Sequence, residues 1–225
     1  MKKRSVAALF MLGSALLAEA DFGQFFTEAN KAVKDKNFAV AEAKYGEALK
    51  AAQNSEQKCN AIVGKFQAMR KLKKNTAAEK FALDAVENET LNPQEIRRIL
   101  NTVADSLLWT RRLDFALDLL NQASQQECPK SSNIYYATYS GMAFIYGKRN
   151  QPQAVIEVMD NVLRVREQHL ANHYSAHMRT GKAYEQLGKK DEALKHYRKA
   201  LECGKKIKYK FNYSPAEKAI ERMSK

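Results

Sequence analysis

The chain has 225 residues, of which 28% are charged, and its formal net charge is +13. It contains only 9 glycines and 4 prolines, whereas Ala, Leu, Lys and Glu are abundant. Such a composition favours helices over strands, so it argues against a sheet protein and predicts an all-α fold.

The N-terminal residues differ from the rest of the chain. Basic residues at positions 2–4 precede an apolar run at residues 5–18, and small residues flank Glu19. This order is typical of a secretory signal peptide. We expect residues 1–20 to be removed before Asp21, which places the protein in the bacterial periplasm or outside the cell. Because the run is shorter than the ~20 residues that span a membrane, a retained anchor is the secondary alternative.

The strong positive charge indicates which partners are favoured. It raises the encounter rate with anionic molecules, which for an exported protein are acidic proteins, anionic glycans or lipid head groups, and we expect no nucleic-acid partner. The basic aromatic segment at residues 205–211 could touch such a surface. We favour the alternative that Tyr209 and Phe211 pack beneath a C-terminal helix. A plainer interpretation of the charge is a solvated, soluble surface.

One stretch, residues 181–201, has the spacing that two antiparallel helices need for close packing. Ala193, Tyr197 and Ala200 share one face of its second helix at i, i+4 and i+7. The full pattern of small, aromatic, Leu-Gly, Ala, aromatic and Ala consists of Gly181, Tyr184, Leu187, Gly188, Ala193, Tyr197 and Ala200. In this order it resembles the tetratricopeptide repeat family. The resemblance implies a helical-repeat protein that binds other proteins.

Four further copies of this pattern precede the clear one. The residues at the position of Ala193 are Ala41, Ala78, Ala116 and Ala154, and the five positions are 37, 38, 38 and 39 residues apart. In the fourth copy, Ala154 and Val158 carry the pattern. The family period is ~34 residues, so longer helices or looser connections must absorb the excess. Helical-repeat families with periods above ~40 residues fit the middle copies nearly as well.

We therefore predict a right-handed helical-repeat solenoid over residues 21–225, built from about five tetratricopeptide-like helix pairs and a C-terminal capping helix. The pairs are expected at residues 22–55, 59–91, 95–126, 135–168 and 174–207. The cap is expected at residues 214–225, where Ser214 and Pro215 form a helix start.

The resemblance also implies where a partner binds, because defined positions of each first helix line a concave groove in this family. Carried onto this sequence, they select Arg70, Lys71, Arg98, Asn101, Trp109, Tyr136, Tyr139 and Tyr146. Aromatic rings offer contact area, and the cations could hold a carboxylate. The alternative is that the tyrosines fill a widened core. The fifth pair, with Met178, Lys182 and Glu185 at these positions, is expected to contribute least to specificity.

Three histidines, His169, His173 and His177, recur every four residues, and a helical pair with this spacing can ligate Zn²⁺. No nearby cysteine or carboxylate clearly completes a tetrahedron, so we expect a packed or exposed histidine face and no metal. The cysteines, at positions 59, 128 and 203, fall in different pairs, and we expect no internal disulfide.

Enzyme signatures are missing from the sequence. It contains no Gly-rich phosphate loop, no nucleophile elbow and no His-Glu-x-x-His motif. We therefore predict no enzyme activity and no cofactor. The expected function is a non-catalytic scaffold or adaptor of the bacterial cell envelope that binds a protein or an extended peptide. The alternative is an accessory factor that associates with a glycan or membrane surface through its basic side chains.

Overall fold

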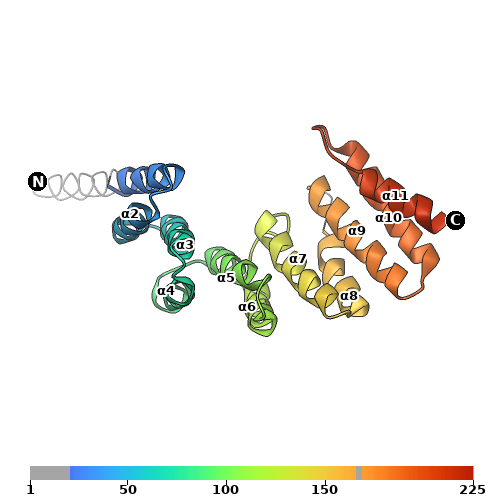
Figure 1. Cartoon of the computed structure of the whole chain (residues 1–225), viewed down its shortest axis with the longest axis horizontal. Helices are drawn as coiled ribbons and strands as arrows, with labels where there is room; N and C mark the ends of the chain where they lie inside the picture. The colour runs from blue at the N-terminus through green and yellow to red at the C-terminus, as the bar shows by residue number, and fades with distance from the viewer. Residues whose placement is uncertain (1–20, 166–168, 225) are drawn as a thin grey trace, which may run out of the picture. The chain divides into compact units, whose positions relative to one another are not determined.

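The computed structural model describes residues 21–165 and 169–224, and every regular element within them is an α-helix (Figure 1). The predicted all-α, helical-repeat fold is confirmed. The predicted signal peptide lies outside the described residues. Among the helices that the structure describes, none combines the length and apolar character needed to cross a membrane. The chain divides after Val103 into two compact units, which we describe separately as the N-terminal and C-terminal units.

The N-terminal unit begins with a helix over residues 21–34. It continues with α2 (Phe38–Ala51), α3 (Ser55–Lys71), α4 (Asn75–Asn88) and the greater part of α5 (Pro93–Leu107). Helices that follow one another in the chain pack together, since α3 contacts both α2 and α4. The side chains of Asn37 and Asn54 cap α2 and α3 by accepting hydrogen bonds from the backbone N–H groups of Val40 and Gln57, in the first turn of each helix.

The C-terminal unit contains the end of α5 and six further helices. These are α6 (Leu113–Gln125), α7 (Asn133–Lys148), α8 (Pro152–Leu163), α9 (Leu170–Gln186), α10 (Lys190–Lys206) and α11 (Ser214–Ser224). Each helix from α7 to α10 packs against the helix before it and the helix after it, and α7 also contacts α9 (Figure 1). This order of contacts is that of stacked antiparallel pairs.

The second helix of each pair buries one stripe of side chains at i, i+4 and i+7. The stripes consist of Ala41, Tyr45 and Ala48; Ala78, Ala82 and Ala85; Ala116, Leu120 and Ala123; Val155, Met159 and Val162; and Ala193, Tyr197 and Ala200. Because these positions lie one above another on a helix, each stripe faces its partner helix. Four of the stripes begin at the residue that the sequence pattern selects.

The fourth stripe differs from the prediction by one residue. Ala154 and Val158, which the sequence pattern selects, are only half-buried, whereas Val155 and Met159 are buried. The prediction assumed that the second helix supplies the small residue. In this pair α7 supplies it instead, because Ala143 belongs to the same core cluster as Val155. The reference position of the fourth pair is therefore Val155.

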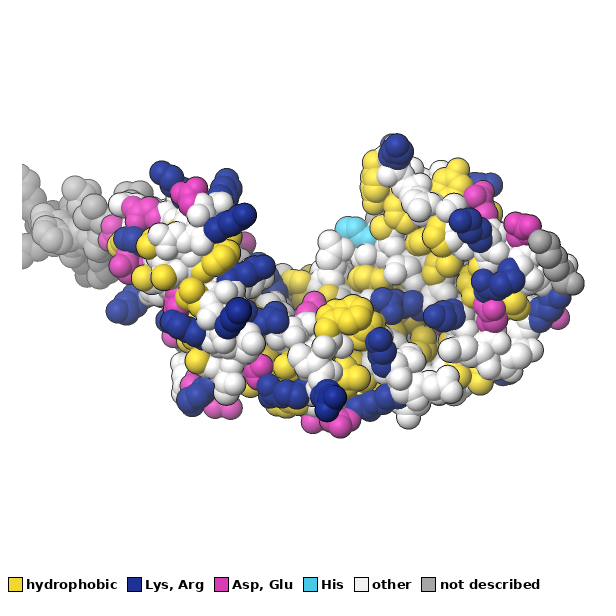
Figure 2. Space-filling view, viewed as in Figure 1, with side chains coloured by type: hydrophobic (Ala, Val, Ile, Leu, Met, Phe, Trp, Pro, Cys, Tyr) yellow, Lys and Arg dark blue, Asp and Glu magenta, His cyan; other side chains and the backbone are white. Residues whose placement is uncertain are grey.

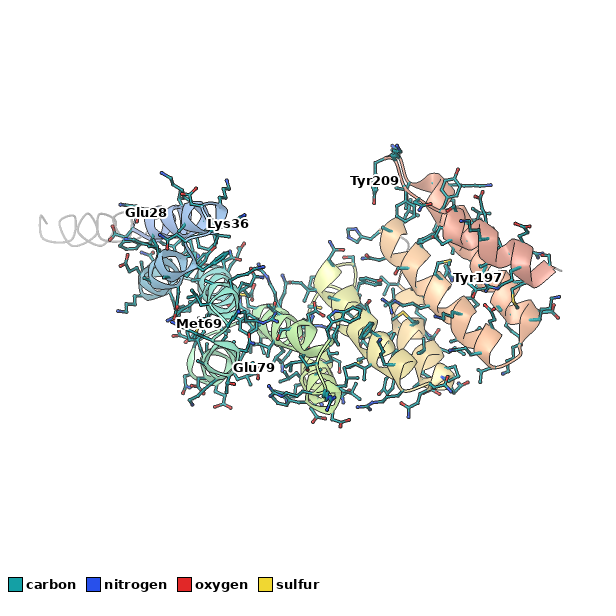
Figure 3. The ribbon with its side chains drawn as sticks, in the orientation of Figure 1. Glu28, Lys36, Met69, Glu79, Tyr197 and Tyr209 are labelled. Carbon is teal, nitrogen blue, oxygen red and sulfur yellow. The ribbon has the colours of Figure 1, made fainter. Side chains whose placement is uncertain are left out.

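The turns inside the pairs support this register. Lys36, Lys73, Asn150 and Gly188 have φ between 53° and 71°, and each lies five residues before the first residue of its stripe (Figure 3 labels Lys36). In each turn the next backbone N–H bonds to the carbonyl five residues earlier, for example Gln151 to Tyr146 at 2.9 Å. This is the Schellman ending of a helix, in which a left-handed residue reverses the chain. The third pair has no positive φ at Arg111.

The last helix, α11, packs on α10 and buries Ala216 and Ala219. In the loop before it, Phe211 packs edge-on against Tyr174 with 4.8 Å between ring centroids. Tyr209 is 65% exposed on the same loop (Figure 3). The expectation that both rings are covered is therefore correct for Phe211 and wrong for Tyr209.

Candidate interaction groove

A groove of about 310 Å³ lies along α7 and α9 in the C-terminal unit. Its lining consists of Ala143, Phe144, Gly147, Lys148, Val155, Arg179, Lys182, Ala183 and Gln186. Ala143, Gly147 and Ala183 are small, which leaves space between the two helices. Three lining side chains are cations, and none is a carboxylate. In Figure 2, Lys and Arg side chains lie beside hydrophobic ones over this pair of helices.

Trp109 stands beside this groove. It lies in the turn between α5 and α6, not within a helix, and is 79% exposed. Its ring meets the ring of Phe144 edge-on with 4.9 Å between centroids. The Lys148 ammonium lies 5.4 Å from the Trp109 centroid and 5.5 Å from that of Phe144. Such cation–π contacts are worth ~0.5–1 kcal/mol each at exposed sites, so they orient Lys148 beside the two rings.

A second groove, of about 860 Å³, lies between α9 and α11. Arg179, Lys182 and Gln186 line both grooves. The one carboxylate in the second groove belongs to Glu185, which accepts a hydrogen bond from the Tyr197 hydroxyl at 2.7 Å and forms an ion pair with Arg222 at 2.6 Å. Burial, together with Glu185, raises the pKa of Tyr197, so this hydroxyl stays a donor.

The two shared cations of α9 keep their charge available. Within the described residues, 21–165 and 169–224, neither Arg179 nor Lys182 forms an ion pair. The one carboxylate in the lining of the second groove, on Glu185, is occupied by Arg222 and Tyr197. The grooves therefore present net positive charge around an apolar surface.

Three predicted groove residues have a different environment. Tyr136, Tyr139 and Tyr146 are half-buried and pack against the core cluster that contains Val155 and Met159. The register predicted for the fourth pair is one residue too early. Moving it by one residue places Phe144, Gly147 and Lys148 at the inner positions of α7. None of the three is among the residues that line the described groove, and their assignment to a partner site stays a prediction.

Four other predicted residues belong to the N-terminal unit. Arg98 donates a hydrogen bond to Asn60 Oδ1 at 2.7 Å, and Asn101 is 5% exposed. Arg70 lies over the Phe66 ring, 5.9 Å from its centroid, and is exposed like its neighbour Lys71. These four residues lie in a different compact unit from Trp109.

Sequence reasoning missed Phe144, Lys148 and Arg179 as lining residues, and it assigned little weight to Lys182. The signal that could have found the first two is Asn150, a residue type that tolerates a left-handed turn and fixes the register of the fourth pair.

Three of the four histidines, His173, His177 and His196, form a packed cluster between α9 and α10, whereas His169 is exposed. His177 Nδ1 lies 3.0 Å from Nδ1 of His196, the fourth histidine of the chain, and His173 is buried. No group of three or more His, Cys, Asp or Glu side chains in the described part of the chain is arranged to hold a metal. The three cysteines are free thiols, and burial raises the pKa of Cys59 to about 11.

The stacked antiparallel pairs define a helical-repeat protein. Residues 174–203 match the model of the tetratricopeptide repeat family, which confirms the resemblance seen in the sequence. Among curated proteins, no sequence matches the chain significantly.

Several solved structures share the fold. One crystal structure of MamA has 19% identity, covers 85% of this chain and 97% of its own, and has a TM-score of 0.59. A second MamA structure has 20% identity, covers 79% and 95%, and has the same TM-score. PilF of Pseudomonas aeruginosa has 14% identity, covers 92% and 84%, and has a TM-score of 0.66.

Proposed function

We propose that the protein is a non-catalytic interaction scaffold that binds a protein or an extended peptide in the C-terminal unit. The observation that carries this proposal is the groove between α7 and α9, which combines three cations and an apolar surface with the exposed Trp109 beside it. Large exposed aromatic residues are enriched among the energetic centres of interfaces. The repeat match at residues 174–203 supports the same class of function.

In the proposed mechanism, a rigid array of helices presents the lining side chains of the groove to the partner. Tight turns and buried stripes hold successive helices at fixed spacing, so that the lining side chains of α7 and α9 keep one arrangement before a partner arrives. A preorganised surface loses less conformational entropy on binding.

The proposal is tested by photo-crosslinking from within the groove. A photoreactive residue replaces Gln186, which lines both grooves. In a matched control it replaces Arg198, which is exposed on α10 and lines neither. We expect defined crosslinked proteins from position 186 and not from position 198. Equal products from both positions, or none from position 186, would contradict the proposal.

We further propose that the scaffold is exported to the bacterial envelope. This proposal rests on residues 1–20, in which basic residues come first, an apolar run follows and small residues end the segment. Cell fractionation should place the protein outside the cytoplasm. Mass spectrometry of the purified protein should find Asp21 at its N-terminus, whereas an intact Met1 in that fraction would show that the segment is retained.

A second candidate function is association with an anionic glycan or lipid surface. The observation in its favour is the exposed Tyr209 on a loop with Lys208 and Lys210, next to Lys205 and Lys206 at the end of α10. Interfacial tyrosine and clustered lysines suit such surfaces. Sedimentation with anionic vesicles tests it, and the binding should disappear at high salt, while a groove complex with an apolar centre should persist.

A further inference from the structure

We propose that His177 and His196 form a binding site for a monovalent copper ion, Cu⁺, at the interface of α9 and α10. The ion lies between two imidazole nitrogens in linear coordination. This inference is independent of the interaction grooves. The sequence led us to expect no metal, because no cysteine or carboxylate near the histidines of α9 completes a tetrahedron. The fold brings His196 of α10 to within 3.0 Å of His177.

The two imidazole rings meet end to end. Their Nδ1 atoms are 3.0 Å apart, whereas their ring centroids are 5.2 Å apart. The difference is close to the radii of two rings, so the two Nδ1 atoms point at each other. Without a metal, one ring donates its Nδ1–H to the other. A linear, two-coordinate ion needs the same arrangement of facing nitrogens, with the ion in the place of that proton.

A small separation of the rings admits the ion. Two metal–nitrogen bonds of ~2.0 Å span about 4 Å end to end, so the Nδ1 atoms have to separate by about 1 Å. His177 and His196 are both half-buried, and rotation of their side chains can supply this distance. The donating ring gives up its Nδ1 proton and takes up one at Nε2. Binding therefore releases no net proton.

The surroundings of the two rings favour an ion with a single charge. Burial lowers the pKa of both imidazoles, so both are neutral at neutral pH and each has a lone pair to offer. Lys199 acts on His177 and Lys195 on His196 as nearby positive charges. A partly buried site next to these cations disfavours a divalent ion more than a monovalent one.

The number of available ligands also distinguishes copper from zinc. Zn²⁺ in structural sites almost always has four ligands. No group of three or more His, Cys, Asp or Glu side chains among the described residues is arranged to hold a metal. The nearest further histidine, His173, has its ring centroid 6.5 Å from that of His177. Imidazole suits copper, and Cu⁺, with its filled d shell, accepts two nitrogen ligands in a line.

The test is a competition for Cu⁺ between the full-length protein and the coloured chelator bicinchoninate, under reducing conditions without oxygen. The unaltered protein should withdraw one equivalent per chain. H177Q and H196Q should each weaken binding by at least ~10-fold, since loss of even an outer partner of a metal ligand has that effect. The control H169Q alters an exposed histidine and should bind as the unaltered protein does. Equal weakening in all three variants, or no uptake of Cu⁺, overturns the inference.

The thiols need a separate control, because soft sulfur ligands also select Cu⁺. Cys128 is the least buried of the three free cysteines, and C128S should leave binding unchanged. X-ray absorption of the copper-loaded, unaltered protein should show two nitrogen neighbours in linear coordination, and this result does not depend on the folding of any variant. Sulfur neighbours, or displacement of Cu⁺ by an equal amount of Zn²⁺, would overturn the inference.

Discussion

His177 and His196 meet across the interface of α9 and α10, with their Nδ1 atoms 3.0 Å apart. One ring has to donate its Nδ1–H and the other has to accept it, so at least one ring is neutral. Burial first, and then the charge of His196, lower the pKa of His177 from 6.5 to about 4. Burial also lowers the pKa of His196.

This contact makes the stability of the C-terminal unit depend on pH. The groups that face His177 are His173, His196 and Lys199, which lower its pKa, and Glu202, which raises it. Since the folded-state pKa lies below the unfolded value, stability is fully present above pH 6.5 and falls as the pH drops towards about 4. Urea unfolding at several pH values should show this fall. His177→Gln should flatten it, whereas His169→Gln, at an exposed position, should not.

The position of Gly64 on α3 requires a residue without a Cβ atom, because Tyr45 of α2 packs against it. A Cβ at this position would lie 2.5 Å from the ring of Tyr45, whose hydroxyl is bonded to Asn30 at 2.7 Å and cannot easily shift. Gly64→Ala should therefore destabilise the N-terminal unit by about 1–3 kcal/mol. Gly46→Ala is the matched control, because its Cβ would meet only Lys65 Nζ at 3.6 Å. Gly46→Ala should be neutral or stabilising in the same urea titration.

Lys73 holds a left-handed conformation, with φ of 61°, in the turn between α3 and α4. Glycine adopts this conformation without the clash of a Cβ atom. Lys73→Gly should accordingly stabilise the protein by about 0.5–1 kcal/mol. Arg111→Gly, at the corresponding position of the third pair, where φ is not positive, should give no gain. Thermal unfolding followed by circular dichroism measures both changes.

Glu185 connects α9 to the last helix. Glu185→Ala should cost about 1–2 kcal/mol, because it removes charge-assisted bonds to Arg222 and Tyr197. Hydrogen exchange should show the loss as faster exchange in α11. Glu202→Ala breaks an exposed pair with Lys199 and should change stability by less than ~0.5 kcal/mol. Similar effects of the two substitutions would contradict the role assigned to Glu185.

Trp109 is the only tryptophan of the chain. Because it is 79% exposed, its fluorescence emission should be that of a ring in water, and a groove ligand should shift the emission towards shorter wavelength. Trp109→Ala should change stability little and weaken partner binding. Unchanged emission on addition of a bound partner would place that partner elsewhere.

The repeat pattern was predictable from the sequence because buried stripes follow the helical period. Ala41, Ala116 and Ala193 all occupy the expected position. The site was less predictable, since it depends on the register of the helices. A larger residue at a single packing position can shift that register. Val155 takes the place of the expected alanine, and Ala143 on the facing helix compensates. A pattern within one helix contains no record of compensation by another helix, so the lining residues Phe144 and Lys148 were not predicted.

Arg179 and Lys182 line both grooves, which gives α11 a second role. It was expected only to cover an exposed end, but Ala219 and Arg222 form one wall of the groove of about 860 Å³. This helix therefore borders a surface that a partner could occupy. Removal of α11 would therefore alter recognition as well as stability.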